Sequence, residues 1–315
     1  MNYEESLEKL FSLHQFGIKL GLENINKLLA HIGNPEKELK AIHVAGSNGK
    51  GSTSSFIASI LTESGFKVGL YTSPHFINFN ERIRINGVEV PNDFVTSFMN
   101  KNNEFITRES PTFFELTTAM AFKYFAEHGV DYAVIETGLG GRLDATNVLQ
   151  SLASVITSIS LEHTNILGTT IEEIAYEKGE IIKPNQQVFI GSIPDSAKEV
   201  IIKKANKENC KYYELNSYAV FSTSGSTVRL KGETIEINKL PLKGKYQFKN
   251  ASLAVLTISK LFQNISKSII FKGLDNVITN TGIQGRYETY NNSPKVISSY
   301  SSSETSIPNA SYSSW

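Results

Sequence analysis

Short apolar runs alternate with longer amphipathic segments through most of the chain. The apolar runs are rich in β-branched and aromatic residues and predict buried strands at 41–45, 67–72, 131–137, 153–159 and 187–192. The segments between them repeat apolar residues at three- and four-residue spacing, which predicts helices at about 50–64, 92–106, 112–128, 171–182 and 195–207. This alternation is typical of an α/β fold, with a mostly parallel sheet and helices on both faces. Such sheets bind ligands at the carboxyl ends of their strands.

The pattern changes after residue 210. Apolar and polar residues alternate over 211–240, with Gly and Ser between the runs, which predicts a small antiparallel β meander. Helical spacing returns at 246–264 and 267–280. Serine then dominates SSYSSSETSIPNASYSSW, and this composition is typical of disorder. We therefore expect one domain over 1–290, followed over 291–315 by the start of a further domain or a disordered tail.

Composition and charge describe a globular protein. The chain has 315 residues, and its 31 basic side chains balance 31 acidic ones, so no global field attracts nucleic acid or a membrane surface. No apolar run reaches the roughly 20 residues of a membrane span, and MNYEESLEKL is not a secretory signal. The single cysteine, Cys210, excludes disulfides and Cys-based zinc sites within one chain. We expect a cytoplasmic monomer whose specificity resides in local sites.

The most informative segment is the turn after the first predicted strand, HVAGSNGKGSTSS. Gly46, Gly49 and Gly51 can bring backbone N–H groups close to an anion, and the next helix adds its N-terminal dipole. Lys50 would then meet the β- and γ-phosphates of ATP, and Ser52 could hold Mg²⁺. The spacing differs from the Walker A pattern, which has an earlier glycine and no glycine between lysine and serine. The alternative is a glycine-rich surface turn, but its place between strand and helix favours phosphate binding.

Polar residues also stand at the ends of the next strands. Ser73 follows the second strand in YTSPH, and Glu136 ends the third beside a second glycine-rich turn, GLGGRLDATN. A hydroxyl and a carboxylate at this edge of the sheet can bind Mg²⁺ that bridges ATP phosphates. The alternative for Glu136 is an ion pair with Arg142. Metal binding is favoured because the third strand and the phosphate loop converge on one edge.

The remaining candidates depend more on context. His163 lies just after the fourth strand and can complete a second metal shell, although such a histidine is more often a loop residue. Lys178, in a glutamate-rich helix, reads by itself as an exposed salt-bridging lysine. Gln247 and Asn250 open a helix, where amides can read adenine edges or act as caps. Arg286 follows a glycine and can bind phosphate, although without further context it is a surface arginine.

Together these segments resemble the folylpolyglutamate synthase/dihydrofolate synthase family of the Mur-ligase superfamily. The resemblance covers about 40–290 and rests, in family order, on GSNGKGS, YTSPH, FNERIRING, FFE, ETGLGGRLDATN, LEHT-x-x-LG, EKGEIIKP, YQ-x-x-NA and GR-x-E. It implies a P-loop-type, ATP-binding central Mur-ligase domain and ATP-dependent amide ligation. The γ-phosphate would pass to the carboxylate of dihydropteroate or a folate, and the L-glutamate amine would attack the acyl phosphate. The partners would be small molecules, without nucleic acid or membrane.

The resemblance also implies roles for individual residues. The ATP phosphates would be bound by Gly46, Ser47, Asn48, Gly49, Lys50, Gly51 and Ser52. Two Mg²⁺ ions would be held by Ser52, Ser73, Glu136 and His163. Lys178 would be the lysine that the family carbamylates, which gives it a carboxylate for metal binding. Pterin-side contacts would come from Thr112, Phe114 and Asp144, and nucleotide contacts from Asn250 and Arg286. The candidate catalytic residues are Lys50, His163, Lys178 and Arg286.

Some features differ from the family pattern. Glu162 stands where Asp is commoner, and GIQGR replaces a commoner Trp-Pro-Gly-Arg. Family members continue into a C-terminal α/β domain with an Asp-Gly-Ala-His-Asn-Pro-like motif, which this sequence lacks. We therefore expect that domain to be missing and ligation to be weak. The alternatives are a nucleotide-binding remnant without turnover and a Mur-type cell-wall amino-acid ligase, although FNERIRING and GLGGRLDATN favour the folate branch.

Overall fold

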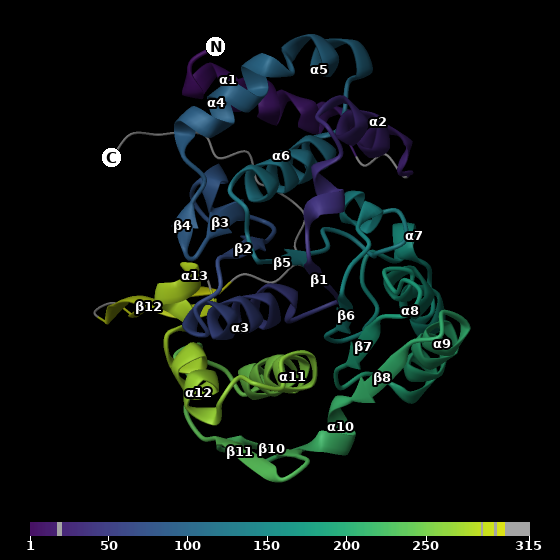
Figure 1. Cartoon of the computed structure of the whole chain (residues 1–315), viewed down its shortest axis with the longest axis vertical. Helices are drawn as coiled ribbons and strands as arrows, with labels where there is room; N and C mark the ends of the chain where they lie inside the picture. The colour runs from purple at the N-terminus through teal and green to yellow at the C-terminus, as the bar shows by residue number, and fades with distance from the viewer. Residues whose placement is uncertain (18–20, 285, 293–294, 300–315) are drawn as a thin grey trace.

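The computed structural model describes residues 1–17, 21–284, 286–292 and 295–299. Within these residues an eight-stranded sheet has the order β4-β3-β2-β5-β1-β6-β7-β8 (Figure 1). Its parallel strands are β1 (Ala41–Ala45), β2 (Val68–Tyr71), β5 (Tyr132–Glu136), β6 (Ala153–Ile156), β7 (Gln187–Ile190) and β8 (Lys211–Glu214). At one edge lie the antiparallel strands β3 (Ile83–Ile85) and β4 (Val88–Glu89). The predicted mostly parallel sheet is confirmed.

Helices cover both faces of this sheet (Figure 1). One face packs against α3 (Lys50–Glu63), α11 (Tyr246–Leu261), α12 (Lys267–Asp275) and α13 (Val277–Thr281). Half of the other face lies under α1 (Tyr3–Ser12), α2 (Glu23–His31), α4 (Asn92–Lys101), α5 (Asn103–Glu109) and α6 (Phe113–Glu127). The other half lies under α7 (Thr164–Leu167), α8 (Ile171–Gly179) and α9 (Asp195–Lys207). Short 3₁₀ segments are η1 (Leu13–Phe16), η2 (Pro35–Glu38), η3 (Phe79–Arg82) and η4 (Ala145–Val148).

The central strand explains why the sequence reads as continuous apolar runs. Side chains alternate across a strand, so Ile42 and Val44 of β1 join the core beneath α3. Ala41 packs with the N-terminal helices, and Ala45 packs with α8 and α9. All these side chains are completely buried. A strand covered on both faces favours apolar residues on both sides, without polar alternation, and His43 is the polar exception in β1.

Two predicted elements were wrong in detail. Residues 211–214 are not part of the meander, because β8 pairs in parallel with β7 at the edge of the main sheet. Its alternating pattern fits that edge position. The Tyr213 ring stacks on the Phe189 ring with 5.3 Å between the ring centroids, whereas Lys211 is exposed. The meander contains α10 (Leu215–Tyr218) and then β9 (Ala219–Phe221), β10 (Ser226–Leu230) and β11 (Glu233–Ile237). The predicted helix over 92–106 breaks at Asn102, whose φ of −104° and ψ of 10° are not helical.

The last described elements are two antiparallel strands. β12 (Arg286–Asn292) pairs with β13 (Lys295–Ser299), so the backbone continues in strand conformation across the boundary predicted near 290. Residues 300–315 lie outside the described residues, so the predicted tail and the missing C-terminal domain stay predictions. In the described ranges we find no helix with the length and apolar character of a membrane span.

Candidate active site

The turn between β1 and α3 forms a compact loop that only glycine can build. Gly46 has a φ of 153° and Gly49 a φ of 82°, where side chains are strained. A Cβ atom on Gly46 would overlap the Thr157 hydroxyl, and one on Gly49 would overlap the Asn250 carboxamide. The loop therefore lies directly against the end of β6 on one side and against α11 on the other. It leads directly into the N-terminus of α3, with Gly49 as the capping residue.

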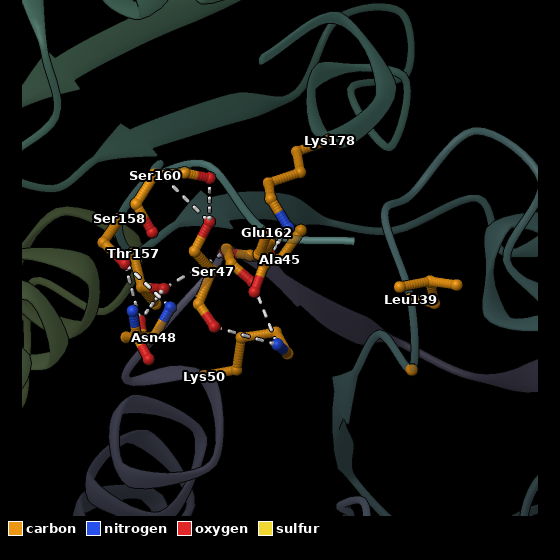
Figure 2. A network of polar contacts seen from close by, with 12 residues as sticks. Ala45, Ser47, Asn48, Lys50, Leu139, Thr157, Ser158, Ser160, Glu162 and Lys178 are labelled. Carbon is orange, nitrogen blue, oxygen red and sulfur yellow. Dashed lines mark hydrogen bonds and ion pairs between the residues drawn. The ribbon is translucent and has the colours of Figure 1, made fainter. Parts of the chain in front are cut away.

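Hydrogen bonds hold this loop to the segment that follows β6 (Figure 2). The Ser47 N–H donates to the Ser158 carbonyl over 2.8 Å, and the Asn48 N–H donates to Ser158 Oγ over 2.8 Å. Ser47 Oγ donates to the Ser160 carbonyl over 3.2 Å, and the Ser160 N–H returns a bond of 3.0 Å to the same hydroxyl. Because these bonds form within the protein, the loop has its shape before any ligand binds.

Lys50 begins α3 and turns back over the loop. Its side chain is only 7% exposed, and Nζ donates to the Gly46 carbonyl over 2.9 Å and to the Ser47 carbonyl over 3.4 Å. Gly51 and Ser52 follow in the first helical turn, where N–H groups have no partner four residues back. A buried cation and a helix N-terminus thus converge on one small volume, which is the arrangement that phosphate binding needs.

Ser73 and Glu136 lie together, as the sequence predicts. Glu136 ends β5, which pairs with β1, and its side chain is 3% exposed. Glu136 Oε2 accepts a bond of 3.0 Å from the Ser73 N–H, just after β2. Arg142, the predicted alternative partner, donates instead from Nε to Glu177 Oε1 over 2.9 Å. A buried carboxylate and a hydroxyl residue therefore meet at the carboxyl ends of neighbouring strands.

Lys178 is not the exposed lysine that its helix predicts. Its side chain is 1% exposed, and Nζ contacts Glu162 Oε1 at 2.6 Å (Figure 2). Burial, followed by the charge of Lys50, lowers the pKa of Lys178 to about 8 although Glu162 acts in the opposite direction. Burial also raises the pKa of Glu162, but the Lys178 and Lys50 cations outweigh that effect and hold it below its ordinary value. Two lysines and one carboxylate thus form a buried cluster beside the phosphate loop.

His163 stands at the entrance of α7 with a φ of 44° and a half-buried side chain. Among the described residues no protein group hydrogen-bonds to its imidazole, and its backbone carbonyl accepts from the Ile166 and Leu167 N–H groups. It follows Glu162 directly, which places its backbone next to the lysine cluster. A metal-binding role for His163 stays a prediction.

Two of the predicted pterin-side residues, Phe114 and Asp144, contact Gly138. Phe114 packs so closely on this glycine that a Cβ there would lie 2.5 Å from the ring. Asp144 Oδ2 accepts from the Gly138 N–H over 2.9 Å, and Thr112 caps the helix α6 that carries Phe114. Burial raises the pKa of Asp144, against the opposing effect of its hydrogen bonds. Asp144 therefore has a structural role as well as its predicted role as a substrate contact.

The loop after Ser73 is organised from within. The Glu81 carboxylate accepts hydrogen bonds from the N–H groups of Phe76, Ile77 and Asn78, over 2.6 to 2.9 Å. Arg82 donates from Nε to His75 Nδ1 over 2.7 Å, and burial with the Arg82 charge lowers the pKa of His75 to about 4. Glu81 and Arg82 are both buried, so they are not the solvated residues that such a loop usually carries.

On the opposite side of the phosphate loop, α11 contributes amides. Gln247 is completely buried and donates from Nε2 to Ser52 Oγ over 3.2 Å, and Asn250 donates to Gln247 Oε1 over 2.9 Å. Both amides therefore support the phosphate loop, and neither caps α11. Arg286 begins β12, but its side chain lies outside the part of the chain described at side-chain level, so its nucleotide contact stays a prediction.

The structure also adds residues that the sequence did not single out for the site. Glu162 is the ion-pair partner of Lys178, and Thr157 and Ser158 hold the phosphate loop. His43 is buried in β1 behind the glycine-rich turn after β5. Their common signal is position: each lies in or just after a strand at the centre of the predicted sheet. That signal locates the residues but does not show which partner each one meets.

Comparison with known proteins matches this architecture to one family. Residues 44–258 match the model of the Mur ligase middle domain. The chain is 38% identical over 308 residues to the dihydrofolate synthase/folylpolyglutamate synthase of Bacillus subtilis, covering 93% of this chain and 72% of that protein. The chain belongs to the folylpolyglutamate synthase/dihydrofolate synthase family of Mur ligases. This is a family of ATP-dependent ligases, so the predicted family, fold class and ligase type are confirmed.

Solved structures of this family agree with the fold. The chain superposes on E. coli FolC in complex with DHPP and ADP with a TM-score of 0.83 and 31% identity, covering 95% of this chain and 70% of that one. An FPGS–AMPPCP–folate complex gives a TM-score of 0.84 with 31% identity, covering 95% and 76%. The chain also matches a probable bifunctional folylpolyglutamate synthase/dihydropteroate synthase of Haloferax volcanii at 36% identity, and there it spans 37% of the relative's length.

Proposed function

We propose that this chain binds ATP at the turn 46–52 and uses it to join L-glutamate to dihydropteroate or a folate. The γ-phosphate passes to the acceptor carboxylate, so that ADP leaves and an acyl phosphate forms. The glutamate amine attacks the acyl carbon, inorganic phosphate leaves, and an amide bond results. The observation that carries the proposal is the preformed loop with the Lys50 ammonium over it. Family membership supplies the reaction type.

ATP binding follows from the hydrogen bonds that the loop can exchange. The carbonyls of Gly46 and Ser47 are neutral acceptors for the Lys50 ammonium. A phosphate oxygen is a charged acceptor, and charge-assisted hydrogen bonds are roughly twice as strong as neutral ones. The first N–H groups of α3 add further donors and a favourable dipole. Complexes of relatives with AMPPCP and with ADP support nucleotide binding by this chain.

The residues at the strand ends fit Mg²⁺ by their chemistry. Ser52, Ser73 and Glu136 offer hydroxyl and carboxylate oxygens, which are the hard ligands that Mg²⁺ prefers. Mg²⁺ usually takes few protein ligands and completes its shell with phosphate and water. The fit therefore holds although the described residues contain no group of three or more His, Cys, Asp or Glu side chains suited to a metal. Bound there, the ion would neutralise phosphate charge, and His163 is the candidate for a second site.

Carbamylation of Lys178 is supported by the cluster around it. The pKa of about 8 gives an appreciable fraction of neutral amine near neutral pH. The neutral amine attacks the carbon of CO₂ and releases one proton, so a carbamate anion forms. Counted from the ammonium, two protons leave, and a cation becomes an anion with a carboxylate group. The Glu162 carboxylate stabilises the unmodified ammonium at 2.6 Å, whereas Lys50 would favour the modified, negative group. The lysine is thus held between one group that opposes the modification and one that favours it.

The acceptor side is supported by the residues around Gly138. Phe114 is half-buried and packs on Gly138, the Gly138 N–H donates to Asp144, and Thr112 stands two residues before Phe114 as the cap of α6. Such a combination suits a flat heterocycle with ring nitrogens. Complexes of relatives with folate and with DHPP support a small-molecule acceptor of this type.

The test is a ligation assay with the purified chain, ATP, Mg²⁺ and radiolabelled L-glutamate. Dihydropteroate, tetrahydrofolate and a UDP-muramoyl acceptor are supplied in parallel, with a reaction without ATP as the control. We expect labelled glutamate in an amide product of dihydropteroate or tetrahydrofolate. A product formed only from the muramoyl acceptor would establish the cell-wall alternative. Nucleotide binding in calorimetry without product from any acceptor would establish the binding-only alternative.

A further inference from the structure

His43 lies in the middle of β1, where the sheet is completely covered. Its side chain has no exposed surface, and burial followed by the charge of Lys183 lowers its pKa to about 3, so the imidazole is neutral at physiological pH. Nε2 lies 2.8 Å from Thr146 Oγ1, in the segment that follows β5. Nδ1 has no hydrogen-bond partner among the described residues. A polar side chain with an unsatisfied nitrogen is costly in such a place, which calls for a specific role.

The direction of the hydrogen bonds fixes the state of the ring. Thr146 Oγ1 also contacts Asp144 Oδ1, and the Thr146 N–H donates to that same oxygen over 3.0 Å. An ionised carboxylate can only accept, so the Thr146 hydroxyl gives its proton to Asp144. The hydroxyl oxygen must then accept from His43, which makes Nε2–H the tautomer present. His43, Thr146 and Asp144 therefore form a directed chain of hydrogen bonds.

Asp144 transmits this chain to the glycine-rich turn. Its second oxygen, Oδ2, accepts from the Gly138 N–H over 2.9 Å and from the Leu139 N–H over 2.8 Å. These amides come two and three residues after Glu136, the last residue of β5. Each oxygen of the buried carboxylate is thus held by two donors. This side chain therefore holds the two ends of the turn together, and the contact between Thr146 and His43 joins the turn to β1.

The same turn holds the end of α8 that carries Lys178. The Arg142 N–H donates to the Glu177 carbonyl over 2.8 Å, and Asn147 donates from Nδ2 to the Glu180 carbonyl over 3.3 Å. A Cβ on Gly141 would come within 3.0 Å of the Lys178 carbonyl, so the two backbones are in direct contact. A shift of the turn would therefore move Lys178. The phosphate loop would stay in place, because it is held from 157–160 and α11.

We infer that His43 is a positioning residue, which through Thr146 and Asp144 fixes the turn 138–147 and with it Lys178 relative to Lys50. The inference rests on the proposed function, because only that function gives the position of Lys178 a consequence for ligation. The alternative is a histidine that only fills the core. An apolar residue would fill that volume without an unsatisfied nitrogen, whereas the chain of bonds needs a donor at Nε2. The two explanations therefore respond differently to substitutions of equal volume.

The decisive variants come in pairs that remove or keep one hydrogen-bonding group. His43→Leu removes the donor, whereas His43→Gln keeps an N–H near the position of Nε2. Thr146→Val removes the hydroxyl at nearly constant shape, whereas Thr146→Ser keeps it. The matched control is Thr257→Val, because Thr257 is equally buried and its hydroxyl bonds only within α11, to the Leu253 carbonyl at 2.8 Å.

Amide hydrogen exchange measures how well the backbone of the turn is protected, and it does not require that the chain catalyse a reaction. We expect His43→Leu and Thr146→Val to speed exchange in peptides spanning 137–147 and 171–180 by about tenfold, while α12 (267–275) stays unchanged. His43→Gln, Thr146→Ser and Thr257→Val should exchange like the parent chain. Equal acceleration in α12, or no acceleration in the turn, would overturn the inference.

Kinetics supply the second arm of the test. In the ligation assay, His43→Leu and Thr146→Val should lower kcat about tenfold to a hundredfold with KM for ATP within about twofold, as expected when a supporting group moves. His43→Gln and Thr146→Ser should recover most of kcat. Equal loss in all four variants would overturn the positioning role. If the parent chain gives no product, the proposed function fails, and the exchange experiment still decides on the chain of hydrogen bonds.

Discussion

The Lys50 ammonium is the residue on which nucleotide binding depends most directly. Its hydrogen-bond partners are the carbonyls of Gly46 and Ser47, both within the loop that it covers. Both partners are neutral, so Lys50 has no ion pair at hydrogen-bond distance among the described residues, and a phosphate would add a charge-assisted bond. This distinguishes Lys50 from Lys178, which already has a carboxylate partner.

Lys50→Ala should therefore weaken ATP binding about tenfold to a hundredfold, because a charged hydrogen bond is worth about 1.5 to 3 kcal/mol. Isothermal titration calorimetry with ATP measures the effect. Lys272→Ala, on the exposed face of α12, is the control and should bind ATP like the parent chain. Equal affinity of the Lys50 variant and this control would contradict the assignment of the phosphate loop.

Glu136→Gln should change the Mg²⁺ dependence of ATP binding more than it changes the affinity for ATP measured without Mg²⁺. The amide keeps the shape of the side chain but loses the charge that a hard cation needs. We expect the Mg²⁺ concentration at half-maximal enhancement of ATP affinity to rise about tenfold or more. Glu63→Gln, at the other end of α3, removes a carboxylate held by Asn276 and Asn280 and serves as the control. Identical Mg²⁺ titrations of the two variants would count against a metal at Glu136.

The pKa of Lys178 predicts how its modification depends on pH. Burial, and then Lys50, lowers that pKa from 10.5 to about 8, so below pH 8 most of the amine is protonated, and the protonated form does not react with CO₂. At a fixed CO₂ pressure, the carbamate should increase steeply as the pH rises from about 6 to about 8, and less steeply above pH 8 until the lysine is fully modified. Glu162→Gln should move this transition to lower pH, because the lost carboxylate no longer stabilises the ammonium.

NMR spectra with ¹³C-labelled CO₂ measure the carbamate, and Lys178→Met provides the control without the amine. An ordinary lysine near its unperturbed pKa of about 10.4 would have well under 1% neutral amine at pH 8. A carbamate signal that remains in the Lys178→Met variant would come from another amine, and not from Lys178. A signal that does not change over this pH range would contradict the role of the lowered pKa.

At the scale of elements, the loop and α3 form one unit whose shape depends on two different properties of glycine. Gly49 precedes α3 with a φ of 82° and touches the Asn250 carboxamide, so it needs both a left-handed backbone and free space. Gly65, just after the other end of α3, has a φ of 88°, but a Cβ added there would meet no atom within 4 Å. Substitution of Gly65 therefore tests backbone strain alone, whereas substitution of Gly49 tests strain together with close contact.

Gly65→Ala should lose only the strain energy of about 1 to 2 kcal/mol, with unchanged ATP affinity. Gly49→Ala should lose more stability than that and at least about tenfold in ATP affinity, because the added methyl pushes the loop away from α11. Urea unfolding gives the free energies, and calorimetry gives the affinities. If both variants lose the same stability and keep their affinity, contact with Asn250 does not shape the loop.

At the scale of the whole molecule, the layer of helices beneath the sheet fixes α3 from behind. Gly273 of α12 lies so close to α3 that a Cβ would come 2.5 Å from Ile60 Cα, and its carbonyl accepts from Ser59 Oγ over 2.6 Å. Backbone cannot yield as a flexible side chain does. α3 and α12 are therefore packed at backbone distance.

Gly273→Ala should destabilise the protein, although alanine is the better helix former by about 1 kcal/mol. Overpacking a rigid contact costs about 1 to 3 kcal/mol, so packing outweighs propensity here. Gly179→Ala in α8 is the matched control, because its close neighbour is only the end of the Ile201 side chain. Thermal or urea unfolding measures the stability of the two variants against the parent chain. Greater stability of the Gly273 variant would show that the two helices are less tightly packed.

Much of this molecule can be predicted from local pattern. The central strands 41–45 and 131–137 read as apolar runs because both faces of the sheet are covered. The strands at the two edges of the sheet are harder to predict. The residues of β8 alternate like those of a strand in an isolated meander, and β3 and β4 are too short to show a pattern. Periodicity reports how a segment is buried, but it does not report which sheet the segment joins.

The sequence by itself determined the order of strands and helices, the glycine-rich loop with Lys50, and the family. These depend on residues close together in the chain, where spacing and backbone preference act directly. The tertiary structure decided that Lys178 is buried against Glu162 and that His43 meets Thr146, 103 residues away. Such contacts arise because parallel strands bring distant segments to the same edge, where burial and neighbouring charges set the pKa of each group.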